Sequence, residues 1–349
     1  MTHKLMFASG WLILASWSFA ASAEAFVEDP ADLASLRADF SRRERELERS
    51  KIEALARFAA THPGEEADAA YDELFGLAMR RELYDAALPA ALVRRDDVKA
   101  DLPARAMALL VSVIAKADAG KYDESFGDLA RFLGEHAAET ADPNRPKLDE
   151  GTAIALGEAY LQRLFNARRY DVAGKFAALV QASVKRPGIQ AHFAPRTARL
   201  AMIGKPAPAI IGEDVDGKPI SLADFKGKVV LVDFWAAWCP PCLEELPRMM
   251  RLAEAHHGAG FTILGINLDA QHEDVGSVAK AKPIVRKLLV SAGISWPTLL
   301  AGAGPADPTA VYGVTAIPAN FLIGKDGTIV GFELSGEALE KAVREELAK

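Results

Sequence analysis

One stretch constrains this chain more than any other, and it runs Leu231-Val-Asp-Phe-Trp-Ala-Ala-Trp-Cys-Pro-Pro-Cys242. The apolar run Val229–Val232 predicts a buried strand leading into it. Apolar residues spaced three and four apart predict an amphipathic helix after it: Leu243, Leu246, Met249, Met250 and Ala253. Cys239 is therefore expected where a strand ends and a helix begins.

At a helix N-terminus several N–H groups have no intrahelical partner, and the helix dipole is positive. A thiolate is stabilised there, so Cys239 is expected to have a lowered pKa and to attack disulfides readily. Cys242 lies one helical turn later, within reach of the Cys239 sulfur. Pro240 and Pro241 suit the first helical turn and are expected to tune the pair. The motif predicts a redox-active dithiol–disulfide couple.

These are the only two cysteines among 349 residues. Oxidation can therefore change the state of this site, but no structural disulfide can form elsewhere in the chain. The length allows one or two domains, each with its own core. The net charge of −7 gives no general attraction to nucleic acid or to anionic lipid.

The N-terminus has the pattern of a secretory signal peptide, predicted to span residues 1–23. A short basic start precedes the apolar run Leu5–Ala20, and Ala21-Ser22-Ala23 has the small-x-small form of a cleavage site. Cleavage after Ala25 is the second choice, and an uncleaved membrane anchor is the alternative to cleavage. The pattern predicts a periplasmic or secreted protein, in a compartment where disulfide chemistry is meaningful.

Residues 24–200 are predicted to form an all-α domain of helical hairpins. The span Asp32–Ala60 has the pattern of one long amphipathic helix or two short ones, which Thr61-His62-Pro63-Gly64 ends. Tyr-Asp pairs recur at residues 84, 122 and 170, each expected at the start of the second helix of a hairpin. Their spacings of 38 and 48 residues indicate a degenerate, tetratricopeptide-like array. Such an array either binds a protein partner in a groove or is a packed bundle with solvated charged faces.

Residues 201–349 alternate strands with helices. A hairpin with a two-residue turn is expected at 210–220, and the central strand at 229–235 leads into a helix from Pro241 to about His256. A strand at 261–268, a helical crossover at 273–292 interrupted by Pro283, a short strand at 298–300, a hairpin at 319–332 and a last helix from Gly336 follow. This order predicts an α/β domain with a central sheet and helices on both faces.

The second domain resembles the thioredoxin superfamily and, within it, the TlpA-like periplasmic thiol-disulfide oxidoreductases. The resemblance covers roughly residues 201–349. It rests on the cysteine motif and on Gly204-Lys-Pro-Ala-Pro208, Ser221-Leu222 to Lys228, Glu245, Pro247 and Tyr312-Gly-Val-Thr-Ala-Ile-Pro318. It implies that Pro318 is cis and faces the cysteines, and that the backbone of Ile317 pairs with an extended substrate strand. It also favours a reductase of protein disulfides, fed by a membrane-bound electron donor.

Asp233 is the most informative carboxylate. It lies six positions before Cys239, as the buried aspartate does in thioredoxin, whereas many TlpA-like sequences carry a neutral residue there. Burial would raise its pKa, and it could then accept the Cys242 proton through water. The alternative is a hydrated strand-end aspartate. Glu245 either tunes the pair or only packs and solvates. Trp238 is expected to cover Cys239 at the surface and to contact the substrate there.

Three other functions compete with disulfide exchange. Cys239 and Cys242 could form half of a zinc site, but no second histidine follows His256 and His257 at finger spacing, so no metal is expected. A peroxiredoxin-like antioxidant enzyme shares the lead-in Gly204–Lys228, yet it needs a lone peroxidatic cysteine. In a partner-binding or assembly protein whose helical domain is the working part, the cysteine pair would have no function. No nucleotide fingerprint is present, so no cofactor is expected.

Overall fold

The computed structural model describes residues 32–137, 146–302 and 307–349. The predicted signal peptide and both cleavage positions lie outside these ranges. Contacts divide the chain into two compact units, Met1–Ser50 and Lys51–Lys349. The second unit contains the predicted α/β domain, residues 201–349, and most of the predicted helical domain, residues 24–200. The start of the first helix belongs to the first unit. The boundary between the two domains stays a prediction.

Helix α1 (Leu33–Thr61) is one continuous helix rather than two short ones. In the part of α1 that belongs to the first unit, up to Ser50, the apolar side chains of Leu33, Phe40 and Leu47 are exposed. In the second unit Ile52 and Ala59 are buried. The helix ends where predicted, before Gly64, whose φ of 98° favours glycine.

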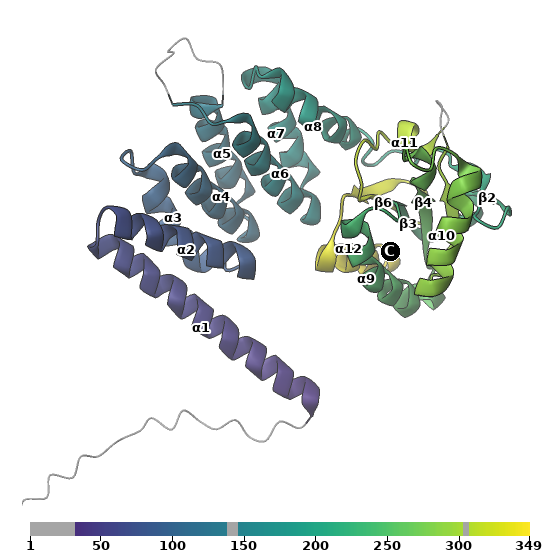
Figure 1. Ribbon diagram of the computed structural model, residues 1–349, viewed down its shortest axis with the longest axis horizontal. Helices are drawn as coiled ribbons and strands as arrows, with labels where there is room; N and C mark the ends of the chain where they lie inside the picture. The colour runs from purple at the N-terminus through teal and green to yellow at the C-terminus, as the bar shows by residue number, and fades with distance from the viewer. Residues whose placement is uncertain (1–31, 138–145, 303–306) are drawn as a thin grey trace, which may run out of the picture. The chain divides into compact units, whose positions relative to one another are not determined.

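Seven further helices form what we call the helical array. They are α2 (Glu65–Arg81), α3 (Tyr84–Asp96), α4 (Leu102–Asp118), α5 (Tyr122–His136), α6 (Glu150–Asn166), α7 (Tyr170–Ser183) and α8 (Pro187–Leu200). They run in successive antiparallel pairs (Figure 1). Tyr84, Tyr122 and Tyr170 are the first residues of α3, α5 and α7, so each Tyr-Asp pair begins the second helix of a hairpin, as predicted.

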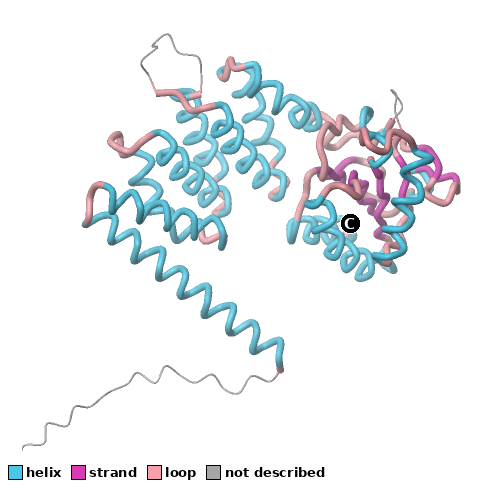
Figure 2. The backbone as a smooth tube through the Cα atoms, in the orientation of Figure 1, coloured by secondary structure: helices cyan, strands magenta, loops and turns pink. Residues whose placement is uncertain are grey.

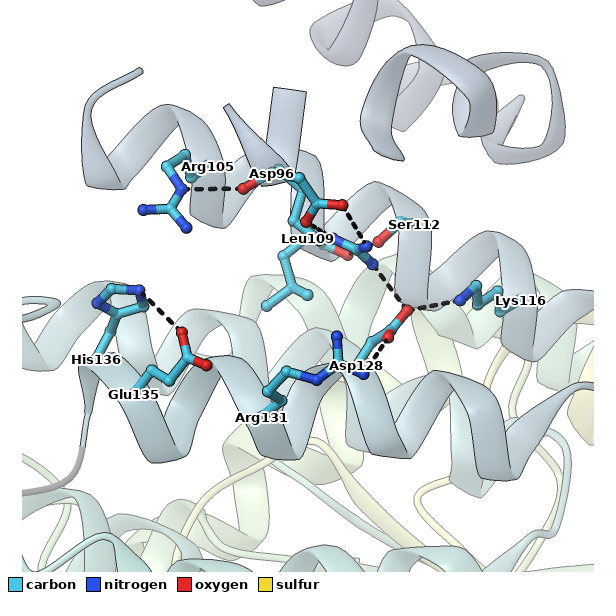
Figure 3. A network of polar contacts seen from close by, with 10 residues as sticks. Asp96, Arg105, Leu109, Ser112, Lys116, Asp128, Arg131, Glu135 and His136 are labelled. Atoms are coloured by element: carbon cyan, nitrogen blue, oxygen red, sulfur yellow. Dashed lines mark hydrogen bonds and ion pairs between the residues drawn. The ribbon is translucent and has the colours of Figure 1, made fainter. Parts of the chain in front are cut away.

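A buried charge network joins three helices of this array (Figure 3). Asp128 on α5 accepts from Lys116 on α4 at 2.6 Å and from Arg95 on α3 at 2.8 Å. Burial acts to raise the pKa of Asp128, but the hydrogen bond from Lys116 and the charge of Arg95 outweigh it and hold the pKa below its usual range. The partners on α3 and α4 therefore compensate the buried charge. Losing one of them would leave the Asp128 charge partly uncompensated and destabilise the fold.

Residues 201–349, here called the sheet domain, contain all the strands of the described residues (Figure 2). The central sheet has the order β5-β4-β3-β6-β7. Its strands are β3 (Val229–Trp235), β4 (Phe261–Asn267), β5 (Thr298–Leu300), β6 (Ala319–Ile323) and β7 (Ile329–Phe332). Strands β3, β4 and β5 are parallel, whereas β6 and β7 are antiparallel to their neighbours. This is the predicted thioredoxin-like sheet.

Helices cover both faces of the sheet (Figure 1). They are α9 (Pro240–His256), α10 (Val278–Ala292), the short α11 (Pro308–Val311) and α12 (Gly336–Leu347), with 3₁₀ turns at Leu222–Phe225, His257–Ala259 and Asp269–Gln271. Successive side chains of β3 point alternately to the two faces of the sheet. Val229 and Leu231 join the apolar cluster of α9 and α12, and Val230 and Val232 join the cluster that includes α10.

Two details of the sheet domain differ from the sequence prediction. The hairpin of β1 (Ile211–Glu213) and β2 (Pro219–Ser221) exists, but Asp214 N donates to Lys218 O at 2.9 Å, so its loop has three residues. Gly217 takes the left-handed position of that loop, with φ of 82°. Pro283 does not interrupt α10 and lies inside it.

The outer edge of β7 is covered. Ile329 N donates to Lys205 O at 2.9 Å, and Phe332 N donates to the Tyr170 hydroxyl of α7 at 3.0 Å. Just past the strand, Gln162 of α6 donates to Glu333 O at 2.8 Å. The array and the segment before β1 thus satisfy backbone groups that an edge strand would leave open. In the described part of the chain, no helix is both long and apolar enough to cross a membrane.

Candidate active site

The two cysteines lie where the sequence predicted them. Strand β3 ends at Trp235, and Cys239 is the N-cap of α9, with Pro240 and Pro241 in the first turn. Cys242 N donates to the Cys239 sulfur at 3.3 Å. Cys239 and Cys242 form a disulfide, with Cα atoms 5.3 Å apart. Because that N–H and the helix dipole both act on the Cys239 sulfur, a thiolate formed there on reduction is stabilised.

The turn before the cysteines is held by two residues that the sequence analysis missed. Asp269 Oδ2 accepts from Ala237 N at 2.8 Å, and Asn267 Nδ2 donates to the same oxygen at 2.7 Å. Both side chains are buried. Their signal was available, since Asn267 ends the buried strand β4 opposite the last residue of β3, and Asp269 lies two residues further on. They position the backbone that leads into Cys239.

Trp238 is exposed beside the motif. Its side chain is 45% exposed, and its ring lies 5.1 Å from that of His272, centroid to centroid. Cys239 itself is only 4% exposed in the disulfide form. An exposed aromatic next to a covered sulfur is compatible with the predicted substrate contact, which stays a prediction.

The Ile317–Pro318 peptide bond is cis, as the resemblance implies. It lies in the loop between α11 and β6, which begins at Tyr312. The Tyr312 ring is buried, and its hydroxyl donates a hydrogen bond to Pro208 O at 2.8 Å. Burial raises the pKa of the Tyr312 hydroxyl above its usual range. Ala316 and Pro318 are exposed and Ile317 is half-buried, so this backbone is open to an approaching chain.

Asp233 lies in the middle of β3, opposite Gly265 of β4 and Asn320 of β6. Its side chain is buried, unlike that of a hydrated strand-end aspartate. Burial raises the pKa of Asp233 to about 7, and the negative charge of Glu245 adds to that rise. A carboxyl group with such a pKa exchanges protons near neutrality, which is what a base for Cys242 requires.

A cavity of about 730 Å³ joins several of the predicted site residues. Asp233, Cys242, Glu245, Ile317 and Pro318 all line it. Cys239, Trp238, Pro240 and Pro241 do not, so the cavity opens on the Cys242 side of the disulfide. The structure therefore groups Cys242, the candidate base Asp233 and the cis-proline loop around one space.

The other wall of this cavity comes from the helical array. Glu158 and Gln162 of α6 line it, together with residues of α8 that include Ala191, His192 and Arg196. This wall was not predicted from the sequence. No local pattern could have shown it, because it depends on how α8 packs against the sheet domain.

Ion pairs fix this wall to the sheet domain at Glu333. Arg196 Nε lies 2.8 Å from Glu333 Oε2, and Arg199 Nη1 lies 2.7 Å from Glu333 Oε1. Glu333 has φ of 50°, a left-handed conformation that is uncommon outside glycine. Asn320, the residue opposite Asp233, accepts from Leu334 N at 3.0 Å and donates to Leu334 O at 2.8 Å. These contacts connect α8 to the strand beside Asp233.

Within the described ranges, no group of three His, Cys, Asp or Glu side chains is placed to hold a metal ion. His256 ends α9 and His257 begins the 3₁₀ turn that follows it. The sulfur atoms that a zinc site would need are joined to each other.

The comparisons with known proteins agree with this chemistry. The family model described as "AhpC/TSA family" matches residues 203–332, within the sheet domain. Thiol-disulfide oxidoreductase ResA of Bacillus thuringiensis subsp. konkukian (strain 97-27) is 35% identical over 147 residues, covering 42% of this chain and 78% of that protein. ResA of Bacillus subtilis (strain 168) is 32% identical over 127 residues, covering 36% of this chain and 64% of that protein.

Among solved structures, the thioredoxin domain of a thiol-disulfide oxidoreductase from Bacteroides vulgatus is 34% identical to this chain. It covers 41% of this chain and 96% of its own, with a TM-score of 0.36. The relatives, the paired cysteines and the cis-proline loop favour neither a peroxidase nor an assembly protein. The chain belongs to the family of ResA-like thiol-disulfide oxidoreductases.

Proposed function

We propose that this thiol-disulfide oxidoreductase reduces disulfides of protein substrates in the cell envelope and is itself reduced by a membrane-bound electron donor. The observation that carries the proposal is the grouping of Cys242, Asp233 and Pro318 around one cavity, next to a Cys239 sulfur at a helix N-terminus. The envelope location rests on the signal-peptide pattern of residues 1–23.

The reaction starts from the dithiol form. The Cys239 thiolate attacks one sulfur of the substrate disulfide, a mixed disulfide forms, and the other substrate sulfur leaves as a thiolate that takes a proton from water. The Ile317 backbone pairs with the substrate strand and holds the reacting sulfur in place. Asp233 then accepts the Cys242 proton through water.

The Cys242 thiolate attacks the Cys239 sulfur, and the second substrate sulfur leaves as a thiolate that takes up the proton held by Asp233 through water. The substrate has gained two electrons and two protons, and the enzyme holds the Cys239–Cys242 disulfide. An external dithiol donor must supply two electrons before the next turnover. The same atoms run backwards would oxidise a dithiol, so the direction depends on relative reduction potentials.

Trapping and potential measurements test the proposal together. A Cys242→Ala variant can attack but cannot resolve, so it should accumulate mixed disulfides with envelope proteins, whereas Cys239→Ala should not. The mature protein should reduce insulin in the presence of a dithiol, with a reduction potential low enough to favour substrate reduction. Equal trapping by both variants would refute dithiol exchange, and an oxidising potential without insulin reduction would refute the reductase direction.

The location has its own test. Expressed in a Gram-negative host with its natural N-terminus, the chain should appear in the periplasmic fraction and begin at Glu24 or Phe26 by N-terminal sequencing. A full-length chain in the membrane fraction would instead support the uncleaved anchor.

A further inference from the structure

The active-site cavity is large enough for a stretch of polypeptide. Its volume of about 730 Å³ lies in the range of sites that bind organic ligands, roughly 300–1,000 Å³. A water path from Asp233 to Cys242 would need only a small part of that space, at about 30 Å³ for each water. The cavity borders Ile317 and Pro318, where a substrate strand would pair. Residues next to the reacting substrate cysteine would therefore reach into it.

The array wall of the cavity is held in a fixed position. Arg196 binds both Glu158 of α6 and Glu333 of the sheet domain, and Glu158 Oε1 also lies 2.6 Å from His192 Nε2. Beneath α8, the Phe193 ring packs edge-on against Phe176 of α7 at 5.3 Å. Both α6 and α8 lie outside residues 203–332, which match the family model. This wall is thus a feature added to the family's domain.

The charges on the cavity lining are unbalanced. Its carboxyl groups belong to Glu158, Asp233, Glu245 and Glu333, its guanidinium groups to Arg196 and Arg199, and its imidazole to His192, which lies against Glu158. Both guanidiniums are engaged with Glu158 and Glu333. Among the described residues, the ion pair of Glu245 is with the guanidinium of Arg248 at 3.8 Å, and that arginine binds Glu340 more closely, at 2.9 Å. A cationic side chain in the cavity would therefore meet Glu245 without a close counter-charge, and Asp233 would add its own negative charge as it loses its proton around pH 7.

We propose that α6 and α8 form the second wall of the substrate site, and that this cavity binds a substrate segment carrying lysine or arginine beside the reacting disulfide. The helical array is then a specificity-determining part of the enzyme. The proposal rests on the disulfide-reductase function proposed above, because it names the class of substrate that the same site takes.

The test uses the full mature protein in its reduced form, mixed in a single turnover with three disulfides. Two are peptides joined through a cysteine to the same leaving thiol, identical except for lysine or glutamate beside the cysteine. The third is 2-hydroxyethyl disulfide, which is too small to reach the array wall and reports that the cysteines react. Acid quenching and alkylation give the second-order rate constant for each.

The wild-type protein should react roughly fivefold faster with the lysine peptide than with the glutamate peptide, and the ratio should shrink at high salt. Ala191 lines the cavity, whereas Ala194, on the same helix and also exposed, does not. Ala191→Lys should bring the ratio to one or below, and Ala191→Glu should raise it. Ala194→Lys, which changes the net charge identically, should keep the wild-type ratio.

The outcomes distinguish a failure of this inference from a failure of the disulfide-reductase function. If wild type shows no preference, or if Ala191→Lys and Ala194→Lys give the same ratio, the cavity does not select cationic segments and only this inference fails. If the reduced protein reacts with neither peptide nor with 2-hydroxyethyl disulfide, the disulfide-reductase function fails and the inference with it. Thermal unfolding of each variant shows whether a changed ratio comes from a folded protein.

Discussion

The carboxyl group of Asp233, buried in β3, lies close enough to that of Glu245 on α9 for the negative charge of Glu245 to raise its pKa. Burial is the larger cause of the rise, and the neighbouring charge adds to it. The two groups line the same cavity as Cys242. The effect of Glu245 on the cysteine pair, left open by the sequence, therefore has a physical route through Asp233.

Replacing Glu245 should lower the pKa of Asp233. In the oxidised protein, Glu245→Gln removes the repelling charge, so the pKa should fall below about 7 yet stay above its usual range, because burial remains. The Asp233 carboxyl can be titrated by ¹³C NMR. Glu244→Gln is the matched control, since Glu244 is exposed and does not line the cavity. An unchanged titration in Glu245→Gln would show that this charge does not reach Asp233.

Replacing Asp233 with asparagine should slow resolution of the mixed disulfide. Attack by Cys239 should change little, since the helix N-terminus still stabilises its thiolate. Without its proton acceptor, resolution should lose roughly 10²-fold or more near neutral pH and recover as pH rises and Cys242 ionises unaided. Stopped-flow measurement of both steps across pH would show this. Resolution unchanged at every pH would make Asp233 a structural residue.

Asp233 should also make the oxidised protein less stable as pH rises. Its native pKa of about 7 exceeds its value in the unfolded chain, so between about pH 4 and pH 7 the native state holds a proton that the unfolded state has released. The free energy of unfolding should fall by about 1.4 kcal/mol for each pH unit in that window, or about 4 kcal/mol in all. Urea unfolding of wild type and Asp233→Asn would measure the difference. Parallel pH curves would contradict it.

The Tyr170 hydroxyl should stabilise the junction between the array and the sheet domain. Burial raises the pKa of Tyr170 to about 12, so the hydroxyl stays neutral and accepts from Phe332 N. Tyr170→Phe leaves that N–H without its partner and should cost about 1–3 kcal/mol in urea unfolding. Tyr122→Phe, at the same position of the preceding hairpin, should cost less than about 0.5 kcal/mol. Equal costs would mean that the bond to Phe332 adds nothing.

Local patterns in the sequence predicted the position of the cysteine pair at the start of a helix and most of the fold. The strand, turn and helix around Cys239 follow from apolar spacing and the two prolines, and each Tyr-Asp pair marked the start of a helix. The role of Asp269 needed the knowledge that two neighbouring strands end at one edge. The array wall could not be predicted, because Arg196 and Glu333 lie 137 positions apart and meet only through tertiary packing.

The covered edge of β7 bears on how this chain avoids association with copies of itself. An open edge strand offers a row of free N–H and C=O groups to which another chain can add a strand. Here Lys205, Tyr170 and Gln162 occupy those groups at Ile329, Phe332 and Glu333. A sheet domain cut free of the array would keep its cysteines but lose the bonds from Tyr170 and Gln162. The array that lines the active-site cavity thus also covers the sheet edge through which another copy of the chain could add a strand.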